Sequence, residues 1–221
     1  MNNFYLAHIK RRTYSIGKKK LKSLNIFEIG KAHGQLEDGD RTYSMTSTSP
    51  DNNKIAFFIS NQDNKTTLFG LLDPKNDLFK KIPIPGIEKA KNFEIMLNDN
   101  NRKMRLLTSR FLTKEGGKII AGTEISSEIY VMDKSADTLL NKTFTSHLTK
   151  NEKTGTYPKE LGDRVQFEDY SRKIYEDINF RNHVWDEKKK VYYRFSFQMK
   201  YDDNAKLKEG QEFPQPFGAT V

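Results

Sequence analysis

An aromatic and basic segment near the C-terminus holds the residue types best suited to binding chemistry. In the run VYYRFSFQM, residues 191–199, the alternation of a β-strand places Tyr192 and Arg194 on one side. A buried arginine needs an acid or carbonyl partner. An arginine beside aromatic rings can instead contact a ligand, because such rings stack on sugars or bases. Both interpretations stay open, and the candidate binding residues are Arg181, Trp185, Tyr192 and Arg194.

The same alternation places an apolar set on the opposite side of this segment. We expect this set to belong to the core, and it comprises Val191, Tyr193, Phe195, Phe197 and Met199. The polar side, which also carries Ser196 and Gln198, would then line a channel or a seam between sheets.

Patterns for catalysis, metals and cofactors are weak in this sequence. The chain has no cysteine, which excludes disulfides, thiolate metal sites and cysteine nucleophiles. Gly116 and Gly117 precede Lys118 as a turn rather than a phosphate-binding loop, and no GxSxG element occurs. The histidines lack metal-ligand spacing, and we expect them in exposed loops; they are His8, His33, His147 and His183. We therefore predict no catalytic residue, no metal site and no cofactor.

Most of the positive charge lies at the N-terminus. The 221-residue chain has a net charge of +9, and residues 1–27 supply seven of these nine charges, because they contain seven basic residues and no acid. We expect the basic cluster at 10–22 to lie on a solvated strand edge, with a phosphate or anionic surface as the alternative. The remaining sequence does not favour a nucleic-acid partner. No apolar run approaches the roughly 20 residues of a membrane-spanning helix, and the start is not a signal peptide as written.

The elements that must position these residues are many short strands separated by polar turns. Strand-like runs, among them residues 25–30 and 105–112, recur at the close spacing typical of sandwiches, barrels and propellers. In KIAFFIS, residues 54–60, Phe57 and Phe58 point to opposite sides, so we expect a β-layer against each face.

One region departs from the strand pattern. Apolar residues in 164–178 recur at steps of three and four, which predicts one short amphipathic helix. The polar run at 149–163 before this helix predicts a surface loop.

A loose repeat connects three of the predicted strands. A polar turn, a lysine and a strand recur at Lys54, Lys118 and Lys190, which are 64 and 72 residues apart. After the first two copies, a second strand ends at an acid, Asp73 and Asp133 respectively. This order outlines a propeller blade, although roughly 40 to 50 residues per blade are usual. Longer loops and the helix would account for the excess.

Two phrases resemble a known family. SPDNNKIAFF, residues 49–58, is similar to a phrase of TolB-like propeller blades. The stretch at 171–200 resembles an uncharacterised bacterial family of six-bladed TolB-like propellers, with its most specific match at Trp185-Asp186 and at 192–195, YYRF. The resemblance covers the chain from about residue 40 onward. It implies export and lipid anchoring at the cell envelope, in the periplasm, and it implies no catalytic residues.

The sequence thus predicts an all-β fold of antiparallel β-propeller blades, about three in an incomplete propeller, with one short helix in a connection. We expect a single partial domain over 1–221, with blade units at 1–48, 49–112, 113–182 and an incomplete 183–221. Such a module would bind a protein or glycan partner at the bacterial cell envelope without catalysing a reaction. The alternative is an enzyme or enzyme accessory of the hydrolase or lyase type, with its site in the propeller channel.

Overall fold

A computed structural model gives the structure of residues 26–47, 54–61, 66–73, 76–99, 103–133, 138–202, 204, 214 and 216–220. The basic cluster at 10–22, which we expect on a strand edge, lies outside the described residues. The chain divides into two compact units. Unit 1 comprises Met1–Glu88, Phe111–Ala121 and Tyr130–Asn141, and unit 2 comprises Lys89–Arg110, Gly122–Ile129 and Lys142–Val221.

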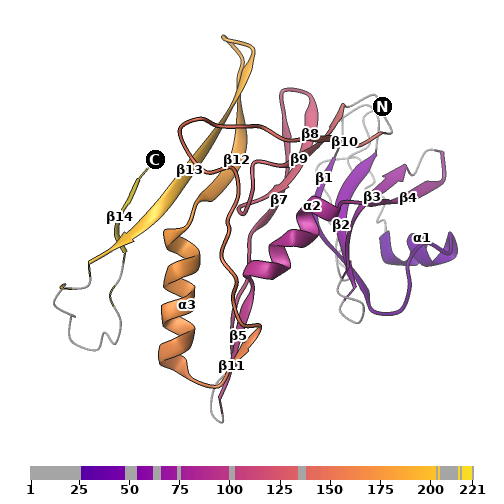
Figure 1. Ribbon diagram of the computed structural model, residues 1–221. Coiled ribbons are helices and arrows are strands. Elements are labelled where there is room, and N and C mark those ends of the chain that lie inside the picture. The colour runs from indigo at the N-terminus through magenta and orange to yellow at the C-terminus, as the bar shows by residue number, and fades with distance from the viewer. Residues whose placement is uncertain are drawn as a thin grey trace, which may run out of the picture. The chain divides into compact units, whose positions relative to one another are not determined.

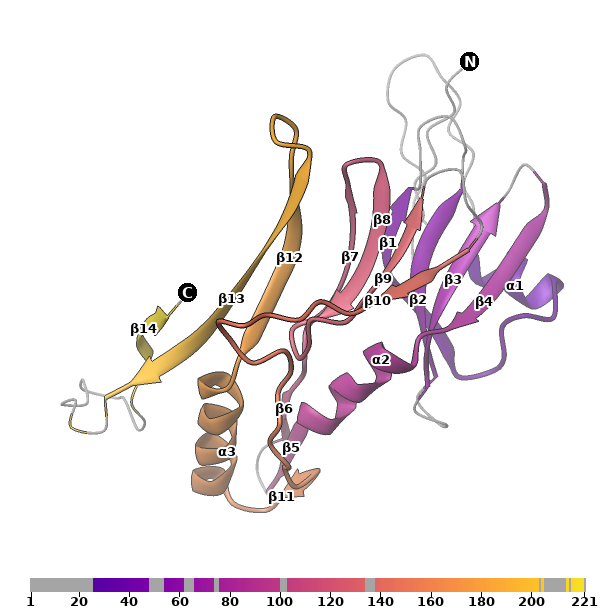
Figure 2. The same cartoon turned by 45° about the horizontal axis from the view of Figure 1, so that its top comes forward.

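Unit 1 contains most of two four-stranded antiparallel sheets and two short helices. The first sheet has the order β1 (Asp40–Ser47), β2 (Ile55–Asn61), β3 (Thr67–Asp73) and β4 (Leu78–Pro83). The second has the order β10 (Leu140–Lys142), β9 (Ile129–Asp133), β8 (Lys118–Thr123) and β7 (Arg110–Glu115). The helices are α1 (Ile26–Ala32) and α2 (Pro85–Glu88). In both sheets, strands that follow each other in the chain are neighbours, as Figures 1 and 2 show. The fold is mostly β with antiparallel sheets, as expected, but it is not all-β, and one strand pair elsewhere in the chain is parallel.

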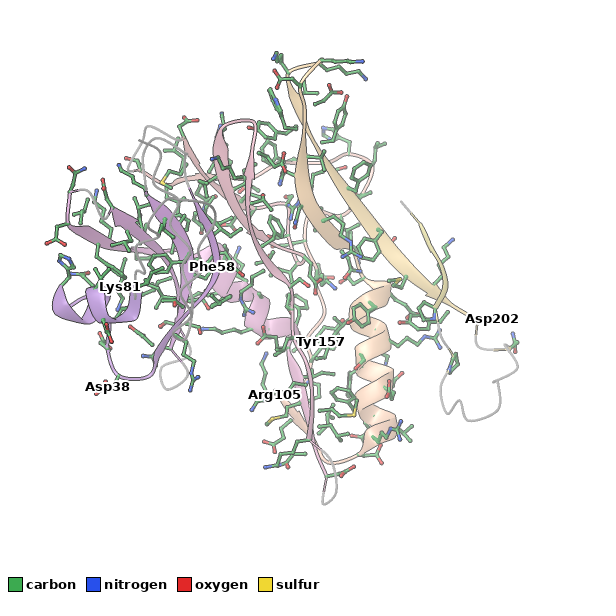
Figure 3. All side chains as sticks on the ribbon, turned by 180° about the vertical axis from the view of Figure 1, so that it is seen from behind. Asp38, Phe58, Lys81, Arg105, Tyr157 and Asp202 are labelled. Carbon is green, nitrogen blue, oxygen red and sulfur yellow. The ribbon has the colours of Figure 1, made fainter. Side chains whose placement is uncertain are left out.

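Strand β2 is buried on both faces, and the two faces contact different kinds of element. Phe57 and Phe58 are both fully buried, as expected. Phe58, labelled in Figure 3, packs in a cluster whose members on the second sheet are Ile119, Ala121, Tyr130 and Met132. Phe57 packs in a separate cluster with Phe79 and with Ile26 of α1. The expected β-layer on the Phe57 face is therefore wrong, because in the described part of the chain a helix packs there.

Helix α1 occupies sequence that we predicted as a strand, residues 25–30. The prediction is wrong because tertiary packing overrides the strand preference of isoleucine. Ile26 and Ile29 lie three residues apart, so a helix turns both toward the Phe57 cluster. At Gly30, an added Cβ would lie 2.5 Å from Leu36 Cδ1, which shows how closely the helix approaches the segment after it. The expectation of a single short helix is also wrong, since α1 and α2 accompany the predicted one.

The lysine and the acid of the repeat form equivalent ion pairs in two hairpins. Lys54 Nζ lies 3.7 Å from Asp73 Oδ2 beside β2 and β3. Lys118 Nζ lies 3.7 Å from Asp133 Oδ1 beside β8 and β9. The two pairs differ in burial, since the Asp73 side chain is 2% exposed and the Asp133 side chain is 56% exposed. The repeat in the sequence therefore reflects the same ion pair in both sheets, between the start of one strand and the end of the next.

In unit 2, the predicted helix packs on a small sheet. Helix α3 (Arg164–Glu176) begins after Asp163, whose side chain accepts a hydrogen bond from the Gln166 backbone N–H at 2.8 Å. Its apolar stripe, with Phe167 and Ile174, is buried. The sheet has the order β11 (Glu160–Leu161), β5 (Ile95–Asn98) and β6 (Lys103–Leu106), and the 3-10 helix η1 (Lys89–Phe93) precedes it. The helix predicted over 164–178 is confirmed and ends two residues earlier.

The other sheet of unit 2 carries the candidate binding residues. Strands β12 (Asn179–Asp186) and β13 (Val191–Tyr201) form an antiparallel hairpin, and β14 (Pro216–Thr220) pairs with β13. Strand β12 lies in sequence for which we predicted no strand. The predicted strand at 105–112 is in fact divided between β6 and β7. The single domain and its blade boundaries remain predictions.

Candidate functional site

The tip of the β12–β13 hairpin is built from local hydrogen bonds. Asp186 Oδ1 accepts the backbone N–H groups of Lys188 and Lys189, each at 2.9 Å, and the Asp186 carbonyl accepts the N–H of Lys190 at 2.8 Å. Lys190 has a φ of 56°, the left-handed conformation that closes the turn. This turn fixes the register in which Trp185 lies opposite Tyr192.

Trp185 and Tyr192 form the aromatic pair of the hairpin. Their ring centroids lie 4.7 Å apart with the planes tilted by 49°, a favourable cross-strand arrangement. Trp185 Nε1 donates a hydrogen bond to Glu187 Oε2 at 2.6 Å. The side chains of these two candidate residues are in direct contact, and both residues are half-buried.

Arg194 lies opposite His183 and binds backbone carbonyls of unit 2. Its Nε donates to the Arg181 carbonyl at 2.9 Å, and Nη1 and Nη2 donate to the carbonyls of Ser126 and Thr123 at 2.8 and 2.7 Å. The guanidinium carbon lies 4.7 Å from the centroid of the Phe180 ring. Burial lowers the pKa of Arg194 to about 10. The three backbone carbonyls are therefore the hydrogen-bond acceptors that a buried arginine requires.

Arg181 lies on the opposite side of the hairpin from Arg194. Its guanidinium carbon is 4.6 Å from the centroid of the Phe197 ring. Phe197 and Arg194 are three residues apart in β13, so their side chains lie on opposite faces of the strand. The side chain of Arg181 is exposed. The four predicted residues therefore do not converge on one point: Trp185, Tyr192 and Arg194 share one face, and Arg181 reaches the other. Their binding role remains a prediction.

The set predicted as core instead faces solvent over much of its length. The exposed fractions are 51% for Val184, 42% for Val191, 40% for Tyr193 and 54% for Phe195. We call these four residues the open face of the hairpin. Lys189 Nζ lies 5.8 Å from the centroid of the Tyr193 ring. The assignment of Val191, Tyr193 and Phe195 to the core is wrong, because the buried side of the sheet is the one with His183 and Arg194. On that side, backbone carbonyls accept hydrogen bonds from the charged Arg194 guanidinium.

His183 is buried rather than exposed, so the expectation of an exposed loop histidine is wrong at this position. Its side chain belongs to β12, and the residue is 6% exposed. Burial and the nearby charge of Arg194 lower the pKa of His183 to about 4. The imidazole is therefore neutral at physiological pH, which suits a place beside the Arg194 guanidinium.

A buried lysine organises the connection into α3, where we predicted only a surface loop. Lys153 is 4% exposed, and its Nζ donates to the Ile174 carbonyl at 2.5 Å and to Asn179 Oδ1 at 2.7 Å. Burial lowers the pKa of Lys153 to about 8, although the negative charges of Glu124 and Asp177 act to raise it. The cation satisfies a carbonyl in the last turn of α3, where helices favour positive charge. No residue pattern in the polar run distinguished this lysine from its exposed neighbours.

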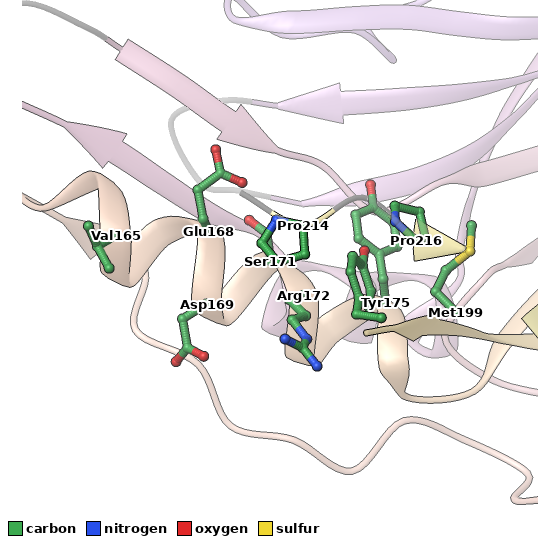
Figure 4. A pocket seen from close by; sticks show the side chains of 10 residues that line it. Val165, Glu168, Asp169, Ser171, Arg172, Tyr175, Met199, Pro214 and Pro216 are labelled. Carbon is green, nitrogen blue, oxygen red and sulfur yellow. The ribbon is translucent and has the colours of Figure 1, made fainter. Parts of the chain in front are cut away.

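A cavity of about 450 Å³ lies beside α3 (Figure 4). Its lining comprises Val165, Glu168, Asp169, Ser171, Arg172, Tyr175, Met199, Tyr201, Pro214 and Pro216. Arg172 Nε lies 2.8 Å from Glu176 Oε1, and its guanidinium carbon lies 5.0 Å from the centroid of the Tyr201 ring. Sequence reasoning missed this cavity, because its walls come from α3, β13 and the segment near β14, which are far apart along the chain.

Two general features bear on function. Among the residues that the structure describes, no three His, Cys, Asp or Glu side chains are grouped so that they could hold a metal ion. Within the same residues, no helix has the length and apolar character required to cross a membrane.

Comparison with known proteins matches nearly the whole chain to a family. Residues 2–214 match the family model described as Domain of unknown function (DUF4221). No curated protein and no solved structure matches the chain. The match supports membership of a family whose function is unknown, and it does not extend to the finer TolB-like assignment.

Proposed function

The chain belongs to this family, and we propose that it is a non-enzymatic binding module that holds a protein partner against the open face of the β12–β13 hairpin. The observation that carries the proposal is the exposure of four large apolar side chains on one side of a sheet. Clustered apolar side chains on a surface are typical of interaction sites. The turn at Asp186 and the carbonyl contacts of Arg194 hold this face in a fixed shape before binding, which reduces the entropy lost on association.

The charges beside the open face favour an acidic partner. Arg181 lies over Phe197, and Lys189 lies near Tyr193, so both cations sit on the aromatic rings of this side. The acids of the turn, Asp186 and Glu187, are already engaged: Asp186 Oδ1 accepts two N–H groups of the turn, and Glu187 is paired with Lys190 and accepts a hydrogen bond from Trp185. A partner segment with Asp or Glu beside Val, Leu or Phe would therefore match both the charge and the apolar surface.

A protein fits this face better than a glycan does. Val184, Val191 and Phe195 offer no hydrogen-bonding atom in their side chains, and sugar hydroxyls would lose their hydrogen bonds to water there. Protein interfaces combine an apolar centre with aromatic residues and arginine. The open face has this composition, with Tyr193, Phe195 and the neighbouring Arg181.

The proposal keeps the propeller architecture and the envelope location that the resemblance implies. Two four-stranded sheets support the propeller, because each has the meander order of a blade. The shared core cluster of Phe58 with Ile119 and Met132 supports face-to-face stacking of these sheets. The number of blades, the TolB-like assignment and the location at the cell envelope are parts of the proposal.

Selection of displayed random peptides on the immobilised full chain tests the proposal. We expect the enriched peptides to combine acidic and apolar residues, and their affinity to fall as salt rises, since the cations contribute. Phe195→Ser should weaken binding about tenfold or more, because an aromatic side chain at the centre of a face contributes strongly. Leu148→Ser is the matched control, since Leu148 is 95% exposed and lies outside the open face.

Several outcomes would overturn the proposal. Equal binding to the Phe195→Ser variant would place the interaction elsewhere, and enrichment of basic peptides would contradict the charge argument. Binding on a glycan array that depends on Phe195, without peptide binding, would replace the protein partner with a glycan. Turnover of a glycoside or ester substrate without peptide binding would favour the enzymatic alternative.

A further inference from the structure

The cavity beside α3 carries negative charge that its own cations do not neutralise. Arg172 is paired with Glu176 at 2.8 Å, and Lys173 is paired with Asp169 at 2.7 Å. Glu168 also lines the cavity, and among the described residues its carboxylate has no ion pair or hydrogen bond. The lining and its ion-pair partners therefore contain one more acid than base.

Tyr201 also lines the cavity, and its pKa is raised. The pKa of Tyr201 is raised first by burial and then by Tyr175, Glu176 and Glu168. Arg172 opposes this shift but does not reverse it, although its guanidinium lies over the Tyr201 ring. A cation entering the cavity would therefore meet a favourable potential.

The remaining walls suit an apolar body attached to that cation. Tyr175 presents an aromatic ring, and Met199 and Val165 present aliphatic groups. Figure 4 shows Tyr175 and Met199 near Pro216, with Pro214 beside Ser171 and Glu168 farther along α3. Aromatic rings and carboxylates together are the groups that recognise alkylated ammonium ions. The volume of about 450 Å³ is within the range of small-molecule sites.

We propose that this cavity binds an organic ammonium ion, with the charged nitrogen at Glu168 and the alkyl body against Tyr175 and Met199. An anion would meet the carboxylate of Glu168, while the neighbouring Arg172 is already neutralised by Glu176. A small metal cation would leave the aromatic and aliphatic walls without contact. The site shares no residue with the open face, so it stands independently of the proposed protein partner.

Titration with choline, monitored by calorimetry and by NMR of the full chain, tests this site. The matched ligand is 3,3-dimethylbutan-1-ol, which has nearly the same shape as choline but no charge. We expect choline to bind at least about tenfold more tightly than the alcohol, because the carboxylate and the ring both act on the charge. Glu168→Gln should remove most of this difference, and Glu152→Gln, an exposed acid outside the cavity, should leave it unchanged.

A second pair of variants separates ring recognition from folding. Tyr175→Phe keeps the aromatic ring and should preserve choline binding within about threefold, whereas Tyr175→Leu should weaken it about tenfold. Unfolding midpoints of all variants establish that the protein remains folded. Equal affinity for choline and the alcohol, absence of choline binding by the folded chain, or unchanged binding in Glu168→Gln would each overturn the proposal.

Discussion

Replacing Arg194 by methionine should destabilise the protein far more than the same change at Arg181. Methionine keeps much of the aliphatic volume of arginine but donates no hydrogen bond, so Arg194→Met leaves the carbonyls of Thr123, Ser126 and Arg181 without this donor. Arg181 is exposed and lies over the Phe197 ring, so Arg181→Met should remove only that contact.

The structure gives the approximate size of the effect. Three hydrogen bonds from a charged donor contribute roughly 1.5 to 3 kcal/mol each. Burial lowers the pKa of Arg194 to about 10, which corresponds to a cost of roughly 3 kcal/mol for the buried charge. The difference predicts that Arg194→Met lowers the free energy of unfolding by roughly 1.5 to 6 kcal/mol. Arg181→Met should lower it by less than about 1 kcal/mol.

Urea unfolding measures both values on one scale. Trp185 is the one tryptophan of the chain and pairs with Tyr192 in the same hairpin, so its fluorescence follows this sheet directly. Far-UV circular dichroism follows the remaining structure. Equal destabilisation by the two substitutions, or less than about 1 kcal/mol for Arg194→Met, would refute the anchoring role of the three carbonyl contacts.

Three further predictions concern Lys153, the repeated ion pair and Gly30. Because the pKa of Lys153 is about 8 in the folded protein and 10.5 in the unfolded chain, the unfolded chain binds more protons between these values. The free energy of unfolding should therefore rise between pH 7.5 and 9.5, by up to roughly 2 kcal/mol, and urea unfolding of Lys153→Met should show no such rise. Asp73→Asn, in the buried pair, should cost roughly 2 to 4 kcal/mol, against less than about 1 kcal/mol for Asp133→Asn in the exposed pair; equal midpoints in thermal unfolding would contradict this. Gly30→Ala should lower the melting temperature despite the better helix propensity of alanine, because the new Cβ meets Leu36 at 2.5 Å, whereas Gly162→Ala, with no atom within 4 Å of its Cβ, should not.

The parts of the fold that sequence predicted are those set by local periodicity. Phe57 and Phe58 are adjacent and both apolar, so a strand must bury both faces, and it does. The three-and-four spacing from Phe167 to Ile174 likewise specifies α3. In each case neighbouring residues alone determine which side of the element is apolar.

The errors arise where burial depends on segments far away in the chain. Alternation separates the two sides of β13 but does not show which side is covered. The carbonyls of Thr123 and Ser126 decide this by binding Arg194, and they lie 71 and 68 residues away. Lys153 is buried by α3 and Asn179 for the same kind of reason. Residues 26–30 form a helix because of the core they contact, although isoleucine and phenylalanine favour strands.

The accessibility of the open face is the most direct test of the account, and the absence of cysteine from the chain makes it simple to measure. Single-cysteine variants Phe195→Cys and Val184→Cys would be labelled with a maleimide in the folded protein, with Ala121→Cys, at a fully buried position, as the reference. We predict labelling of both open-face cysteines at rates close to those in urea, and labelling of Ala121→Cys at least about a hundredfold slower, since it requires opening of the core. Protection of Phe195→Cys and Val184→Cys to the level of Ala121→Cys in the isolated chain would contradict the account, because the face proposed to receive a partner would already be covered.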